Sequence, residues 1–169
     1  MPAALQLTFL LGSIISLLAV KAAFAQSENL GAAPVCAAPC PPGWTQFGSR
    51  CFIFYYESKT WVDAEKFCIS IGGNLASIHS SDENTFLSTM VERVTGRTHF
   101  TWVGGYDAVN DSTWLWSDGS EFNYENWYPD EPNNHRGNPE HCLEINLGGE
   151  QWNDMPCSSS RPFVCSRNL

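Results

Sequence analysis

Seven cysteines constrain this chain of 169 residues more than any other feature of its sequence. They stand at positions 36, 40, 51, 68, 142, 157 and 165. An odd number predicts three disulfides and one cysteine left over in a secreted protein. The sequence alone does not give the connectivity. We therefore expect a small domain in which segments far apart along the chain are covalently tied together.

The N-terminus predicts entry into an oxidising compartment. An apolar run from Phe9 to Val20 is followed by Ala23-Phe24-Ala25, an A-x-A cleavage pattern. This run is shorter than the roughly 20 residues that a membrane span needs. We interpret residues 1–25 as a signal peptide, which implies a secreted, extracellular protein without membrane insertion. The segment before the run lacks Lys and Arg, so an uncleaved anchor stays open as an alternative.

Residues 26–39 are small and Pro-rich and show no hydrophobic periodicity, which is typical of a flexible arm. This arm carries Cys36. One interpretation is an intermolecular disulfide through Cys36, which would give a disulfide-linked homo-oligomer. The alternatives are a capped thiol and a pairing with Cys51.

The charge of the chain excludes some partners. Its formal net charge is −9, and removal of residues 1–25 would make it one unit more negative because Lys21 is lost. Such a surface argues against binding to nucleic acids or anionic membranes and favours cations. Seven Trp and ten Phe supply enough apolar surface for a proper core.

The pattern along the chain predicts two helices and several strands. A first helix is expected over residues 60–71, because its apolar residues recur at steps of three and four and Gly72-Gly73 ends it. A second is expected over 81–94, where Ser80 and Glu83 can form a capping box. The expected strands are 51–55, 74–78, 101–105, 143–147 and 151–154.

Between Tyr106 and Trp127 the chain reads as long irregular loops. Three tryptophans, Trp114, Trp116 and Trp127, could stack on a sugar, but the favoured interpretation is that they pack beneath the loops. Asn110-Asp111-Ser112 is an N-glycosylation sequon, so Asn110 is a candidate glycan acceptor.

A candidate metal site lies between residues 131 and 154. Three carboxylates and two amide carbonyls suit Ca²⁺, which takes 6–8 oxygen ligands. The alternative is an ordinary polar surface loop that happens to be acidic and binds no metal. Transition metals are not expected here, because His135 and His141 lack a partner at useful spacing. The candidate ligands are Glu131, Asn133, Glu140, Asn153 and Asp154.

These residues carry a family resemblance. E-P-N at 131–133, E-x-C at 140–142 and W-N-D at 152–154 resemble the primary Ca²⁺ and sugar site of C-type lectins. The likeness extends from about Cys40 to Cys165 and implies a domain over residues 40–169. The implied fold is α+β, with two helices flanking antiparallel sheets and a long Ca²⁺-binding loop region. The implied disulfides are Cys40–Cys51, Cys68–Cys165 and Cys142–Cys157.

The resemblance also implies a ligand class. In the family, two vicinal sugar hydroxyls coordinate the same Ca²⁺ ion, and the E-P-N order is associated with mannose, N-acetylglucosamine and fucose. Pro132 is the natural place for a cis peptide bond. The expected partners are therefore glycans, on microbial or other cell surfaces, as in innate immunity. His135 could touch the sugar, although an exposed loop histidine is the favoured interpretation. Asn134 and His141 stand where the family's auxiliary Ca²⁺ site has acids, which argues against that second site.

We consider three competing interpretations. The segments Asn74–Ser80 and Trp102–Gly105 are also similar to type II antifreeze proteins of fish, relatives of secreted lectins of the ladderlectin type. A lectin-like domain that binds a protein is the second alternative. An enzyme is not expected, because the sequence offers no isolated carboxylate in an apolar setting that would raise its pKa.

Overall fold

The computed structural model describes residues 40–169 of the chain. The expectations for the signal peptide 1–25, the arm 26–39 and Cys36 lie outside the described residues. Within residues 40–169 no helix is long and apolar enough to cross a membrane.

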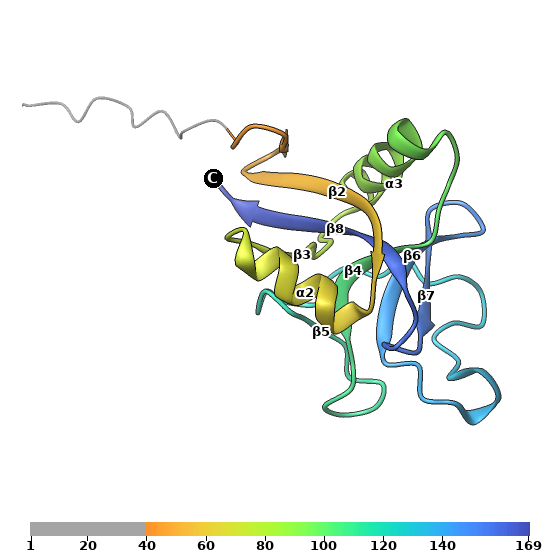
Figure 1. Cartoon of the computed structure of the whole chain (residues 1–169). Helices are drawn as coiled ribbons and strands as arrows, with labels where there is room; N and C mark the ends of the chain where they lie inside the picture. Colours follow the sequence, from red (N-terminus) through yellow and green to blue (C-terminus); the bar gives the residue numbers. More distant parts are fainter. Residues whose placement is uncertain (1–39) are drawn as a thin grey trace, which may run out of the picture. The chain divides into compact units, whose positions relative to one another are not determined.

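Eight strands of the described part form one sheet, in which the main path runs β1-β2-β8-β4-β6-β7. Figure 1 shows the long β2 and β8 lying side by side, with β4, β6 and β7 beyond them. Strand β3 pairs with β8, and β5 pairs with β4. The strands are β1 Thr45–Phe47, β2 Arg50–Lys59, β3 Asn74–Leu75, β4 Thr101–Tyr106, β5 Leu115–Trp116, β6 Cys142–Leu147, β7 Gln151–Met155 and β8 Arg161–Asn168.

The pairing is antiparallel except between β4 and β8, where Trp102 lies opposite Phe163 in parallel register. This parallel contact was not expected from the sequence. It is possible because the connection from β4 to β8 is far longer than the dozen residues that a crossover requires. The result places the last strand of the domain at the centre of the sheet, between β2 and β4.

Both predicted helices are confirmed. Helix α2 spans Trp61–Ser70, and helix α3 spans Ser81–Thr95 before a left-handed Gly96 at φ 76°. In Figure 1, α2 lies beside β3 and β8, and α3 lies behind β2. Ser80 accepts from the backbone N–H of Glu83, as predicted. The reciprocal half of the capping box is different, because the Glu83 carboxylate accepts from the N–H of His79 at 2.8 Å and from Arg50 at 2.8 Å.

The core consists of two apolar clusters, one that includes residues of α3 and the long loops and one that includes residues of α2. Trp114 and Trp116 are buried, with exposed fractions of 9% and 2%, and both belong to the main apolar cluster. Trp127 packs against Trp114, with ring centroids 4.7 Å apart. The favoured interpretation of these tryptophans as packing residues is therefore confirmed. Three disulfides cross-link the domain: Cys40–Cys51, Cys68–Cys165 and Cys142–Cys157.

Candidate functional site

Strands β6 and β7 form the hairpin on which the candidate site is built. Leu143 lies opposite Asp154, and Glu144 lies opposite Asn153. Glu140 stands two residues before β6 begins. This register explains how residues separated by more than a dozen positions meet at one end of a hairpin.

Asp154 holds the E-P-N loop onto β7. Its side chain is buried, with 1% exposure. One carboxylate oxygen accepts from the backbone N–H of Asn133 at 3.0 Å, and the other accepts from the N–H of Asn134 at 2.9 Å. Hydrogen bonds to a charged acceptor are stronger than neutral ones, so this carboxylate fixes the loop's position.

Glu140 closes the opposite end of the same loop. Its carboxylate accepts from the N–H of His135 at 2.6 Å, and its own N–H donates to Oδ1 of Asn134 at 2.8 Å. Asn134 has a left-handed backbone, φ 46°, which asparagine tolerates better than most residues. A short turn of 3₁₀ helix, η1 His135–Gly137, follows and lies at the surface.

Glu131 is the most perturbed acid of the site. The Glu131–Pro132 peptide bond is cis. Burial first, then a hydrogen bond with the Asp154 side chain and the charges of Asp154, Glu140 and Asp130, raise the pKa of Glu131 to about 7. Oxygen Oε2 of Glu131 is buried and has no hydrogen-bond partner.

Glu131 is not an isolated carboxylate in an apolar setting. Burial comes first among the causes of its raised pKa, and the carboxyl groups of Asp154, Glu140 and Asp130 act on it as well. A cluster of carboxylates around a buried, unpartnered oxygen is the environment that a bound cation stabilises.

Asn153 is held from the other side of the hairpin. Its amide nitrogen donates to Oε1 of Glu144 at 3.0 Å, and Arg161 donates to Oε2 of the same carboxylate at 2.6 Å. Glu144 is buried, with 1% exposure. Because the Asn153 amide nitrogen is engaged with Glu144, its carbonyl oxygen is the atom available to a cation.

The five sequence-predicted residues therefore fall into two connected groups. Glu131, Asn133 and Glu140 are linked to Asp154 through its own hydrogen bonds and those of Asn134. Asn153 is adjacent to Asp154 on β7 but is bonded to Glu144. All five offer oxygen donors, and one buried donor oxygen has no partner. Such a donor set fits Ca²⁺ and fits a softer metal poorly.

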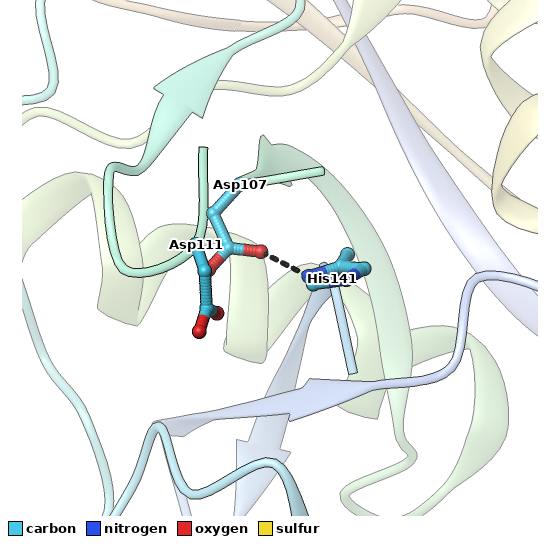
Figure 2. Close-up of side chains that lie close together, drawn as sticks. All are labelled: Asp107, Asp111 and His141. Carbon is cyan, nitrogen blue, oxygen red and sulfur yellow. Dashed lines mark hydrogen bonds and ion pairs between the residues drawn. The ribbon is translucent and has the colours of Figure 1, made fainter. Parts of the chain in front are cut away.

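A second cluster lies beside this site and brings together side chains that are far apart in the sequence. Figure 2 shows Asp107, Asp111 and His141 close together. Nδ1 of His141 lies 2.8 Å from Oδ1 of Asp107. His141 has no partner nearby in the sequence, and Asp107, which follows β4, stands 34 residues earlier in the chain. No spacing rule finds such a pair without the β4–β6 register.

One hollow of the described domain lies elsewhere. It has a volume of about 490 Å³ and is lined by residues that include Arg50, His79, Asp118 and Arg167. Arg50 is already engaged there with Glu83 and with the hydroxyls of Ser77 and Ser166. Because Arg50 already has protein partners, we do not take this hollow as the candidate site.

Comparisons with known proteins identify the family of the chain. Residues 57–167 match the model of the lectin C-type domain. The chain is 47% identical to galactose-specific lectin nattectin of Thalassophryne nattereri, over 77% of this chain and 81% of that protein. It is 51% identical to ladderlectin of Oncorhynchus mykiss, over 77% of this chain and 69% of that protein.

The fold also resembles that of a calcium-independent type II antifreeze protein. Its crystal structure superposes with a TM-score of 0.69 at 32% identity, over 78% of this chain and 96% of that chain. The α+β fold, the three disulfides and the likeness to fish lectins all agree with the expectation from the sequence. The chain belongs to the C-type lectin domain family.

Proposed function

We propose that this protein is a secreted, Ca²⁺-dependent lectin that binds mannose-type sugars. Glu131, Asn133, Glu140, Asn153 and Asp154 would hold the ion and share it with two vicinal hydroxyls of the sugar. The match to the lectin C-type domain supports the general part of this proposal, that the chain is a carbohydrate-recognition domain. The metal, the sugar class and the export of the protein are proposals.

One observation carries the proposal: Oε2 of Glu131 is buried without a partner, within a cluster that raises the pKa of Glu131. A buried acceptor without a hydrogen bond costs about 1–3 kcal/mol, and more when the group is charged. A surface loop without a bound ion offers nothing to offset this cost for an acid beside Asp154 and Glu140. A cation at this place would remove the cost and lower the pKa of Glu131.

The chemistry of the side chains supports sugar binding at the same ion. A carboxylate has two oxygens and an amide has an oxygen and an NH₂ group, so each can serve the ion with one atom and a hydroxyl with another. The order acid-Pro-amide places an acceptor at 131 and a donor at 133. The reverse order would exchange the two. We infer mannose, N-acetylglucosamine or fucose, in contrast to the galactose in the name of nattectin.

A single sugar covers little area in a shallow site, so one site binds weakly and several are needed. A disulfide between two copies through Cys36 would double the number of sites on each molecule. We propose glycans of microbial or cell surfaces as targets, in innate immunity. Asn110 is exposed, so the glycoprotein state proposed for this chain is sterically possible.

The test is retention of the purified protein on mannose-agarose in millimolar Ca²⁺, followed by elution with EDTA, mannose or galactose. Release by EDTA and mannose, but not by galactose, is the expected result. The matched control variant is Glu92→Gln, because Glu92 is an exposed acid on α3 and is not among the groups that raise the pKa of Glu131. Equal retention of the wild type and of Glu131→Gln would overturn the proposed site.

A second candidate function follows from the likeness to the calcium-independent antifreeze protein. If the protein binds ice, thermal hysteresis appears in the presence of EDTA and no sugar resin retains the protein. A protein ligand is the third candidate and would show as Ca²⁺ binding without sugar retention or hysteresis. C-type lectin domains are in general non-enzymatic, and we propose no catalytic activity.

A further inference from the structure

We propose that Asn110 carries an N-linked glycan whose outer mannose units compete for the proposed sugar site of the same chain. The inference rests on the proposed function, because it needs a site that binds mannose. The full sequence holds one N-glycosylation sequon, Asn110-Asp111-Ser112, and it lies in the loop that follows β4. A hydrogen bond joins this loop to the loop that carries the proposed ligands.

The side chain of Asn110 is open to modification. It is exposed, and its neighbour Val109 has an exposed fraction of 76%. The backbone N–H of Asn110 donates to the carbonyl oxygen of Asp107 at 3.0 Å, and its own carbonyl oxygen accepts from the N–H of Thr113 at 2.9 Å. Asn110 therefore lies where two consecutive surface turns meet, and a bulky glycan there projects from the surface.

The modification preserves the local hydrogen bonding. Nδ2 of Asn110 forms a bond with the anomeric carbon of an oligosaccharide that a lipid diphosphate donates. The bond between this carbon and the diphosphate breaks, the lipid diphosphate leaves, and Nδ2 loses one of its two protons. Nδ2 of Asn110 also donates to Oγ1 of Thr113 at 2.7 Å. The proton that remains on Nδ2 is sufficient for this bond.

The attachment point is one residue away from a direct contact with the sugar-site loop. Oδ1 of Asp111 accepts from the side-chain amide of Asn134 at 3.2 Å. The backbone N–H of Asn134 donates to Asp154 at 2.9 Å, and its Oδ1 accepts from the N–H of Glu140 at 2.8 Å. Two of the proposed Ca²⁺ ligands therefore bond to the residue that Asp111 contacts, and the glycan is tethered beside them.

A polar hollow connects the two loops. Its volume is about 430 Å³, within the range of roughly 300–1,000 Å³ that is usual for small-molecule sites. One wall belongs to the sequon and another to the segment between the proposed ligands Asn133 and Glu140. Its amide, carboxylate and imidazole groups can donate to and accept from sugar hydroxyls. The hollow is lined by Asp111, Asn134, Gly137, Asn138, Pro139 and His141.

The magnitudes favour competition within one molecule. N-linked glycans are built from N-acetylglucosamine and mannose, which belong to the sugar class proposed for this site. A single hexose in a shallow site has a Kd on the order of 1 mM. A ligand on a short flexible tether has an effective concentration of the same order. The glycan would then fill about half of the sites, so the apparent affinity for added mannose would be about twofold lower.

The test uses the full chain secreted from eukaryotic cells that keep their N-glycans in the high-mannose form. Mass spectrometry first measures the glycan on Asn110. Calorimetry in millimolar Ca²⁺ then measures mannose affinity before and after trimming with an endoglycosidase that leaves the first sugar attached. We expect mannose to bind about two- to tenfold more tightly after trimming, the upper value applying if the effective concentration is about ten times the Kd.

Two variants support this comparison. Asn110→Gln cannot be glycosylated and should bind mannose like the trimmed protein, with its folding checked by circular dichroism. Asn168→Gln is the matched control, because Asn168 is an exposed asparagine outside the sequon. Its glycan remains, so its mannose affinity should rise on trimming as in the wild type.

Three results would overturn the inference. They are an unmodified Asn110 in the secreted protein, equal mannose affinity before and after trimming, and an effect of trimming that grows with protein concentration. The last result would assign the competing glycan to a neighbouring molecule. Failure of the proposed function is distinguishable from these, because the trimmed protein and Asn110→Gln would then both fail to bind mannose.

Discussion

The backbone N–H of Asn134 donates to Oδ2 of Asp154 at 2.9 Å, so one carboxylate of β7 closes the loop that carries Glu131. The same carboxylate accepts from Asn133 through its other oxygen. It is thus both a structural anchor and a candidate ligand. A change at this position acts on the loop and on the ion together.

Asp154→Asn is therefore expected to weaken Ca²⁺ binding by at least about tenfold, because a ligand charge and one loop anchor are lost together. Hydrogen bonds to charged groups are worth about 1.5–3 kcal/mol, so thermal stability of the metal-free protein also falls. Calorimetric Ca²⁺ titration and a melting curve check the two effects. Glu92→Gln, a change at an exposed acid on α3, is expected to change neither by much. Unaltered Ca²⁺ affinity in Asp154→Asn would remove Asp154 from the site.

The raised pKa of Glu131 predicts opposite pH dependences for the Ca²⁺ affinity and for the stability of the metal-free protein. Ca²⁺ competes with the proton on Glu131, so its affinity is expected to fall by up to about tenfold per pH unit below pH 7. The stability of the metal-free protein changes with pH in the opposite direction. The folded pKa lies above the ordinary value of 4.5, so the contribution of Glu131 to stability is present below pH 4.5 and is lost as pH rises through about 7.

Ca²⁺ titrations on both sides of neutral pH, with melting curves in EDTA, check these two trends. Glu131→Gln cannot titrate, so both pH dependences are expected to flatten in this variant. A wild-type Ca²⁺ affinity that is the same at pH 6 and pH 8 would contradict the assignment of Glu131 as a ligand.

The order of residues 131 and 133 predicts the sugar class. Glu131→Gln combined with Asn133→Asp exchanges the charged and the neutral ligand across Pro132 while keeping the net charge. We expect the double variant to lose retention on mannose-agarose and to gain retention on galactose-agarose. The wild type eluting with galactose would indicate that the loop after Asn134, and not this order, determines specificity.

The helices and the core could be predicted because their signals are local. Thr60 and Ser80 cap the two helices, and Gly96 ends the second. The apolar positions between them recur with the helical period. Trp114 and Trp116 are predicted to pack beneath the loops, and both are buried. The ligand set and the disulfide pairing came from the family resemblance and not from spacing.

The remaining features depend on contacts that only the folded chain creates. His141 meets Asp107 because β4 and β6 are neighbours, and Glu144 meets Arg161 because β8 returns to the centre of the sheet. Asn134 and Arg136 have positive φ values, which a sequence of polar residues does not specify. Glu144 and Arg161 are 17 residues apart in the sequence, and Asp107 and His141 are 34 residues apart. No helical or strand period connects residues at such separations.

The disulfide Cys142–Cys157 is predicted to stabilise the hairpin of the site. It closes a 15-residue loop around β6 and β7, which the chain-entropy model values at about 3 kcal/mol. Replacing both cysteines by Ala is expected to lower the free energy of unfolding by about this amount and to weaken Ca²⁺ binding. Urea unfolding measures the first effect. Replacement of Cys40 and Cys51, which close a separate loop of 11 residues, is the control and should leave Ca²⁺ affinity unchanged.

The buried pair of Glu144 and Arg161 gives the last prediction. Arg161→Met leaves the Glu144 carboxylate, which is 1% exposed, without its cation. Breaking a fully buried pair costs roughly 3–5 kcal/mol, and the 20% exposure of the Arg161 side chain lowers our expectation to about 2–3 kcal/mol. Urea unfolding of the metal-free protein measures this loss. The double variant with Glu144→Gln no longer has a buried charge, so it should be more stable than Arg161→Met alone. If the loss of stability in the double variant equals the sum of the losses in the two single variants, the pair does not couple β6 to β8.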